Sequence, residues 1–234
     1  MKSILNKVVA VAAGIFLAAS LTVNAIPVYN NTSTDSGSSL NFSNGTTIGN
    51  QIILGGGYTS ALLNNFSFEF YSSNSASAYD VTMSVFLYAN DGTPFNGYAT
   101  PGTTLLFSEN DFTLTLSPGT DAATLHFDVS SQNITVPGEF TLAATVTGLH
   151  ANDILGFEMF TGPTVGSNHQ DYWMNDGNWS LHNLPQNNTG IGASFDAISV
   201  APEPSTFCLG AVGGSMLLGS VWLRRRKQQC KQVC

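Results

Sequence analysis

Basic residues are missing from the whole middle of this chain. No Lys or Arg occurs between Ile26 and Val200, whereas fourteen of the fifteen acidic residues lie in that stretch. Zero bases minus fourteen acids gives the stretch a formal charge of −14, with histidine counted as neutral. Such a charge repels polyanions, and we therefore expect neither nucleic acid nor anionic lipid among the partners of residues 26–200.

Cysteine is also nearly absent. The chain has three cysteines, Cys208, Cys230 and Cys234, and all of them follow the acidic stretch. No disulfide framework holds residues 26–200 together, although an oxidising compartment would permit one. That stretch is roughly 175 residues long, which is enough to bury one hydrophobic core. The three thiols and the distant histidines match no metal-binding pattern, so we predict no metal site from them.

Long apolar runs are also missing from the middle of the chain, and the two that occur lie near its ends. The run near the amino terminus predicts an export signal. Lys2 and Lys7 come before the run Val8–Leu21, and Val23-Asn24-Ala25 ends in a small side chain. This pattern is typical of a secretory signal peptide. We predict that residues 1–25 are removed by signal peptidase after Ala25. A retained amino-terminal anchor is the alternative, but the run is short for a membrane span.

The second apolar run, Phe207–Leu223, predicts a transmembrane helix. It has 17 residues without a charge and would be about 25 Å long as a helix, near the lower limit for crossing a bilayer. Pro202, Glu203 and Pro204 precede it within a linker, residues 201–206. A basic tail, residues 224–234, follows and would stay cytoplasmic as a stop-transfer signal. A buried helix of a globular domain is the alternative. The basic residues of the stop-transfer signal are Arg224, Arg225, Arg226 and Lys227.

This carboxy-terminal arrangement resembles the PEP-CTERM sorting signal. The resemblance covers about 25 residues and matches Pro202, Glu203 and Pro204 to the sorting motif, ahead of a Gly-rich apolar helix and an Arg cluster. It implies a Gram-negative bacterium that produces exopolysaccharide. It also implies a precursor anchored in the inner membrane, which an exosortase cuts before the body reaches the cell surface or extracellular matrix. Residues 228–234 extend beyond the basic block with which such proteins usually end.

Residues 26–200 show the period-two alternation that is typical of β-strands. Turn signals such as Asn90-Asp91-Gly92 and Pro137-Gly138 separate the alternating runs. Short strands with one apolar face predict an all-β fold, and we expect an antiparallel β-sandwich of about eight to ten strands, jelly-roll-like in its connections. The predicted strands include residues 66–71, 81–88, 111–116, 124–129, 140–146, 155–159 and 194–200.

The same stretch is similar to the β-sandwich ectodomains called choice-of-anchor domains, which precede interchangeable surface-sorting tails. The opening Tyr29-Asn30-Asn31 and the run Phe86-Leu87-Tyr88 followed by Asp91-Gly92 contribute to the likeness, as do Pro101-Gly102 and Trp173. That family has no assigned activity, so the resemblance implies architecture alone.

No motif of a known catalytic site occurs, and we predict no catalytic residues. The missing Lys and Arg also remove the usual cationic partners of an oxyanion. The four glutamates of the middle would have to supply a glycosidase pair, but two of them, Glu69 and Glu158, alternate with apolar neighbours and are expected on solvated strand faces. His126 and Asp128 share one face of a predicted strand, and an exposed polar face is the simpler interpretation. The glutamates are Glu69, Glu109, Glu139 and Glu158.

The segment 168–179 is the best candidate for ligand binding. It mixes aromatic rings, which stack on sugars, with carboxylates and amides, which bind hydroxyl groups. Its acids also make Ca²⁺ a possible cofactor, although the spacing does not fit an EF-hand. A plain hairpin, with Trp173 buried and Asn175-Asp176-Gly177 turning, is the interpretation we favour. The candidate ligand-binding residues are Asp171, Tyr172, Trp173, Asp176 and Trp179.

Three functions are compatible with the sequence. We expect an exported, exosortase-sorted surface or matrix protein that is structural or adhesive rather than catalytic. Its expected partners are signal peptidase and exosortase during export, the inner membrane as precursor, and exopolysaccharide afterwards. The alternatives are a lectin-like carbohydrate-binding module and a secreted glycan-active enzyme.

Overall fold

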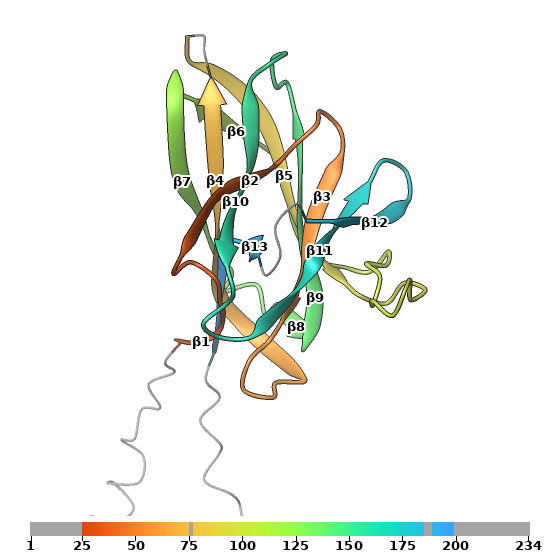
Figure 1. Cartoon of the computed structure of the whole chain (residues 1–234). Coiled ribbons are helices and arrows are strands. Elements are labelled where there is room, and N and C mark those ends of the chain that lie inside the picture. Colours follow the sequence, from red (N-terminus) through yellow and green to blue (C-terminus); the bar gives the residue numbers. More distant parts are fainter. Residues whose placement is uncertain (1–24, 75–76, 185–188, 199–234) are drawn as a thin grey trace, which may run out of the picture. The chain divides into compact units, whose positions relative to one another are not determined.

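The described residues fold into two antiparallel β-sheets (Figure 1). A computed structural model of the protein describes residues 25–74, 77–184 and 189–198, which contain fourteen strands and no helix. The strands belong to one compact unit, Asn24–Ile198. The prediction of an all-β antiparallel sandwich is confirmed. The expected number of eight to ten strands is too low.

The two sheets differ in size. The eight-stranded sheet runs in the order β1-β14-β4-β10-β13, with β2 paired to β10 and both β7 and β8 paired to β4. The six-stranded sheet runs in the order β12-β11-β3-β9-β5-β6. The larger sheet contains β1 (Ala25–Asn30), β2 (Asp35–Asn41), β4 (Ser60–Asn74), β7 (Gly119–Asp128), β8 (Thr135–Pro137), β10 (Ile154–Thr161), β13 (Thr189–Ile191) and β14 (Ala193–Ile198). The smaller contains β3 (Thr47–Ile53), β5 (Tyr79–Ala89), β6 (Leu105–Leu116), β9 (Glu139–Thr147), β11 (Ser167–Asn175) and β12 (Trp179–Asn183).

The connections pass repeatedly from one sheet to the other. The chain changes sheet between β3 and β4, between β4 and β5, and again between β6 and β7. It also changes sheet at every step from β8 to β11. Such crossings place strands from distant parts of the sequence side by side, as in jelly-roll sandwiches.

The core lies between the sheets and is built by the alternation seen in the sequence. Phe66, Phe68 and Phe70 of β4 are all buried, while Glu69 and Tyr71, which flank Phe70, are only partly covered. Other strands repeat the pattern, because one face of each strand meets the opposite sheet. Further buried alternating residues are Val81, Met83, Val85 and Leu87 of β5 and Phe140, Leu142, Ala144 and Val146 of β9.

Strand β3 shows why the predicted number of strands was too low. Its residues Ile48–Ile52 are all buried, including the polar Asn50 and Gln51, so neither face faces water. A strand covered on both sides loses the apolar–polar alternation by which strands are recognised. Strands β8 and β13 have three residues each, which is too short for any periodic signal.

The predicted terminal segments lie outside the described residues. The signal peptide (residues 1–25, apart from Ala25), the linker 201–206, the transmembrane helix 207–223 and the basic tail 224–234 are therefore still predictions. Within residues 25–74, 77–184 and 189–198 there is no helix that would be long and apolar enough to cross a membrane.

Tyr29 in β1 gives the fold a sensitivity to alkaline pH. Its side chain is 0% exposed, and its hydroxyl has no hydrogen-bond partner among the described residues. Burial raises the pKa of Tyr29 far above its ordinary value, so the phenol stays neutral in the folded state. Unfolded Tyr29 ionises above about pH 10, so its contribution to stability is complete below that pH and falls by about 1.4 kcal/mol per pH unit above it.

We expect Tyr29→Phe to be neutral or slightly stabilising at about pH 8, because it removes a buried hydroxyl that lacks a partner. Its advantage over the wild type should grow at about pH 11, where the unfolded wild type gains an ionised phenol. Urea unfolding at both pH values measures this difference. The matched control is Tyr58→Phe, since Tyr58 is 39% exposed and should show no such growth. An equal pH response of the two variants would contradict the prediction.

Candidate functional site

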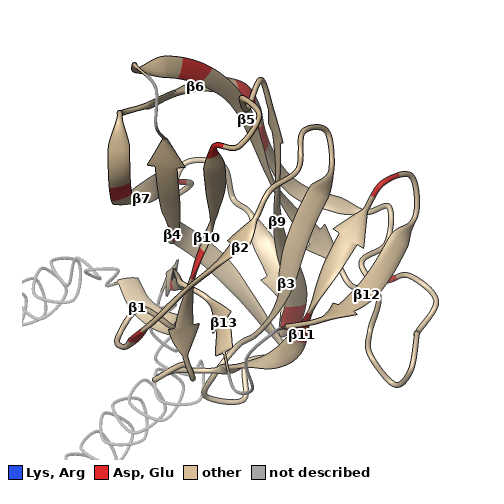
Figure 2. Cartoon of the chain, turned by 45° about the horizontal axis from the view of Figure 1, so that its top comes forward, with Lys and Arg blue, Asp and Glu red and all other residues tan. Residues whose placement is uncertain are grey.

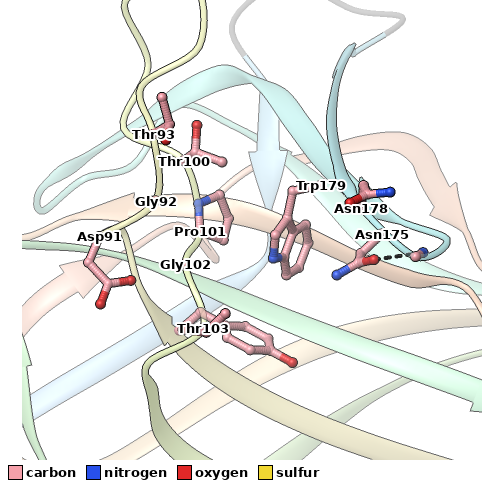
Figure 3. A pocket seen from close by; sticks show the side chains of 12 residues that line it. Asp91, Gly92, Thr93, Thr100, Pro101, Gly102, Thr103, Asn175, Asn178 and Trp179 are labelled. Carbon is pink, nitrogen blue, oxygen red and sulfur yellow. Dashed lines mark hydrogen bonds between the residues drawn. The ribbon is translucent and has the colours of Figure 1, made fainter.

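A groove on the six-stranded sheet is the main cavity of functional interest in the described part of the chain. It lies between the connection from β5 to β6 (residues 90–104) and the turn that joins β11 to β12, and we call it the Trp179 groove (Figure 3). Its volume of about 730 Å³ is within the range of small-molecule sites. The groove is lined by Tyr88, Asp91, Gly92, Thr93, Thr100, Pro101, Gly102, Thr103, Asn175, Gly177, Asn178 and Trp179.

The β5–β6 connection forms the first wall of the groove and is held by its own backbone. The Gly92 amide donates to the Thr100 carbonyl at 3.0 Å, and the Gly102 amide donates to the Ala89 carbonyl at 2.9 Å. The Asp91 carboxylate accepts a hydrogen bond from the Thr104 hydroxyl. A Cβ on Gly102 would lie 1.6 Å from that carboxylate, so a larger residue there would displace the Asp91 side chain.

Polar contacts also fix this connection to the sheet beneath it. Tyr98 donates a hydrogen bond to Asp171, which raises the pKa of Tyr98, and its ring meets His169 edge-on with ring centroids 4.6 Å apart. The Thr141 hydroxyl donates to the Asn90 side chain at 2.7 Å. These contacts to β9 and β11 give the first wall one defined position.

The β11–β12 hairpin forms the second wall. Asn175 and Trp179 are the last paired residues before the turn, and the Gly177 amide donates to the Asn175 side-chain oxygen at 2.9 Å. The Trp179 ring meets Tyr88 of β5 edge-on, with centroids 5.3 Å apart and an interplanar angle of 78°. Figure 3 shows the Trp179 ring between Pro101 of the first wall and Asn175 of the second.

The structure separates the five ligand-binding residues predicted from the sequence. Trp173 is 1% exposed and does not line the groove, so its side chain is not available to a ligand there. Trp173 is buried, as in the hairpin interpretation, and pairs with Gly49 on the outer face of the six-stranded sheet. Asp171 binds Tyr98, Tyr172 stacks on His182, and Asp176 is exposed in the turn. Of the five, Trp179 alone lines the groove.

The first wall was not predicted as part of a site. In the sequence, Tyr88, Asp91 and the Pro101-Gly102 pair indicate a strand end, two turns and the likeness to choice-of-anchor domains, but no ligand site. They meet Trp179 because the β5–β6 connection returns over the sheet, and Tyr88 and Trp179 are far apart in the sequence. A pairing that depends on tertiary structure leaves no local signal. The mixture of an aromatic residue with Asp-Gly and Pro-Gly turns was the only available hint.

The two acids predicted to bind Ca²⁺ are not brought together. Asp171 and Asp176 are five positions apart along the hairpin, which corresponds to roughly 15 Å of extended strand. Among the described residues, no group of three or more His, Cys, Asp or Glu side chains is arranged to hold a metal ion.

A second, smaller hollow lies on the outer side of the eight-stranded sheet. It has a volume of about 300 Å³ and is lined by acidic and hydroxyl side chains of β2, β4 and β10, including Asp35, Tyr71 and Glu158. Burial, together with the nearby charge of Asp35, raises the pKa of both Glu69 and Glu158. The sequence predicted that both glutamates are solvated, whereas in the structure both are partly covered.

His126 and Asp128 share the exposed face of β7, as predicted. Asp128 accepts hydrogen bonds from the Ser130 hydroxyl at 2.6 Å and the Ser130 amide at 3.0 Å, and these bonds lower the pKa of Asp128. The carboxylate is thus engaged by the turn that follows β7, and an exposed polar face remains the simplest description of this pair.

Comparisons with known proteins give the chain no family. No family model matches it, and no curated protein matches it. Two solved structures are weakly similar: infectious bursal disease virus Gt strain and the T13 IBDV viral particle. They have TM-scores of 0.25, are 15% and 13% identical, and cover 84% and 78% of this chain. The chain spans 47% and 41% of their lengths, and at this similarity they support no functional inference.

Proposed function

We propose that this chain is an exported surface or matrix protein of an exopolysaccharide-producing Gram-negative bacterium, sorted by an exosortase, with a structural or adhesive rather than catalytic role. The observation that carries the proposal is the placement of the seven basic residues. All of them flank the two terminal apolar runs, and none occurs between Ile26 and Val200. Basic residues beside an apolar run set its orientation in a membrane, so this pattern supports export of the acidic body.

The pairing of β1 with β14 is consistent with this arrangement. Ala25 and Ile198 are paired residues, so the chain enters and leaves the sandwich at neighbouring points. The predicted cleavage after Ala25 would remove one exposed residue of β1 and leave its buried residues, Val28 and Tyr29, in place. The sorting motif at Pro202, Glu203 and Pro204 begins a few residues after β14. Neither processing event would therefore cut into the core.

Carbohydrate binding is the second candidate function, and the Trp179 groove is the observation that favours it. An aromatic ring beside amides and hydroxyl groups provides contacts for a sugar. The two functions are compatible, because a matrix protein that binds polysaccharide would be adhesive.

Deletion of residues 207–234 tests the sorting proposal. We expect the truncated protein in the periplasm or medium of the native host, because the predicted membrane anchor is gone. The matched variant replaces Pro202, Glu203 and Pro204 by alanine and keeps the anchor, so it should accumulate uncut in the inner membrane. Cell fractionation and mass spectrometry of the mature carboxy terminus measure both outcomes. Surface retention of the truncated protein, or surface material that still ends in Val233-Cys234, would refute the proposal.

A further inference from the structure

We propose that the Trp179 groove binds uncharged pyranose sugars. The proposal rests on the carbohydrate-binding candidate and not on the sorting route, so the two can fail separately. Its first support is the corner that Trp179 and Tyr88 form, with the rings 5.3 Å apart and nearly perpendicular. A pyranose has an apolar C–H face, which packs on one ring while the sugar's edge contacts the other.

The polar side chains of the groove match sugar hydroxyl groups. A hydroxyl group both donates and accepts hydrogen bonds, and the amides and hydroxyls of the groove have the same dual capacity. Asn175 uses its oxygen to accept from the Gly177 amide, so its NH₂ group is what it presents to a ligand. The uncharged polar residues that line the groove are Thr93, Thr100, Thr103, Asn175 and Asn178.

Thr100 provides an independent sign of a missing partner. Its hydroxyl oxygen is buried and has no hydrogen-bond partner among the described residues. Such an atom costs free energy unless water or a ligand reaches it. Because Thr100 lines the groove, a rotation of its side chain would bring the hydroxyl group to a bound sugar, which would provide that partner.

The charges around the groove select against anionic sugars. Asp91 lines the groove, and the exposed Asp176 lies in the turn of its second wall. Figure 2 shows acidic residues and no basic ones on the described part of the chain. A uronate or sulfate group would therefore meet two carboxylates without a cationic partner. A neutral sugar meets no such repulsion.

Both walls are already in place before any ligand binds. The first is held by the hydrogen bonds of Gly92 and Gly102 and by the contacts of Tyr98, and the second by the hairpin and the bond from Gly177 to Asn175. A preformed site loses little conformational entropy on binding, which is important for weak ligands such as sugars.

Calorimetric titration of the full chain tests the proposal. The protein is purified in a zwitterionic detergent without a sugar headgroup and titrated with cellohexaose, laminarihexaose and mannohexaose, with hexagalacturonate as the charged counterpart. We expect at least one neutral hexasaccharide to bind and hexagalacturonate not to bind. Trp179→Ala should weaken binding by at least about tenfold, as for a central aromatic contact. Phe95→Ala is the matched control, because Phe95 is 51% exposed on the same connection but does not line the groove, and affinity should stay within about twofold.

Thr100→Val keeps the experiment decisive if circular dichroism shows that Trp179→Ala is unfolded. Valine preserves the shape of threonine and removes the hydroxyl, so affinity should fall by about threefold or more in a folded protein. Absence of binding to all three neutral hexasaccharides would overturn the proposal. An unchanged affinity of folded Trp179→Ala would also overturn it. If Trp179→Ala does not fold, an unchanged affinity of Thr100→Val would do the same. Equal binding of hexagalacturonate would overturn the selection for uncharged sugars.

Discussion

Phe66→Ala should destabilise the sandwich by about 3–5 kcal/mol, since it removes a fully buried phenylalanine ring from the core. Phe66 is 0% exposed and lies on β4 between β14 and β7, where it is paired with Phe195 on one side and Phe127 on the other. Its ring stacks on both, with centroids 5.3 Å and 4.8 Å away, and meets Phe107 of the opposite sheet edge-on at 5.3 Å. The substitution therefore removes contacts to two neighbouring strands and to the facing sheet.

Guanidinium unfolding of the full chain, followed by far-UV circular dichroism, measures this loss. A domain of ordinary stability, about 5–15 kcal/mol, would lose a large fraction of it, and its unfolding midpoint would fall accordingly. Phe86→Ala is the matched control, because Phe86 is half-buried on the outer face of β5 and contacts Tyr88 with centroids 5.7 Å apart. We expect about 1 kcal/mol or less from it. If Phe86→Ala proved the more damaging substitution, the core would be wrongly placed.

The fold was predictable wherever one face of a strand meets water. In β4 and β5 the apolar residues alternate with polar or half-exposed ones, so the sequence alone identifies the strands and their buried faces. The same reasoning fails for β3, whose outer face is covered by the β5–β6 connection. Gln51 donates from that face to the Ala99 carbonyl at 3.4 Å, a contact that no local pattern reveals.

The candidate site was predictable only in part, and for a related reason. Trp179 stood out because its segment mixes aromatic and polar residues within a few positions. Trp173 lies in the same segment and was predicted for the same reason. Composition cannot tell that Trp173 is buried while Trp179 lines the groove. Their positions along the hairpin separate them, since Trp173 pairs with Gly49 inside the sheet and is 1% exposed, while Trp179 lies at the start of β12 beside the turn. Tyr88 and Thr100 joined the site through the crossing of distant strands, which the sequence does not encode locally.

Gly166→Ala should be nearly as damaging as the loss of Phe66, through the backbone and not the core. Gly166 precedes β11 and has a φ of 79°, which side-chain-bearing residues rarely adopt. A Cβ at this position would lie 2.4 Å from the Ile53 carbonyl oxygen and 2.9 Å from the Tyr29 ring. Neither atom is the end of a flexible side chain, because Ile53 is paired with Ser167 and Tyr29 is buried.

Gly97→Ala separates the two causes of that damage. Gly97 has a similar φ of 84°, but a Cβ there would meet no atom within 4 Å. We expect Gly97→Ala to cost about 1–2 kcal/mol from the left-handed backbone alone, and Gly166→Ala about 3–5 kcal/mol because β11 must also move away from β3. Guanidinium unfolding of both variants measures the difference. Equal losses in the two variants would contradict the prediction. They would mean that the pairing of Ile53 with Ser167 shifts easily to make room for the added methyl group. The β3–β11 register that positions the Trp179 hairpin would then be only weakly fixed at Gly166.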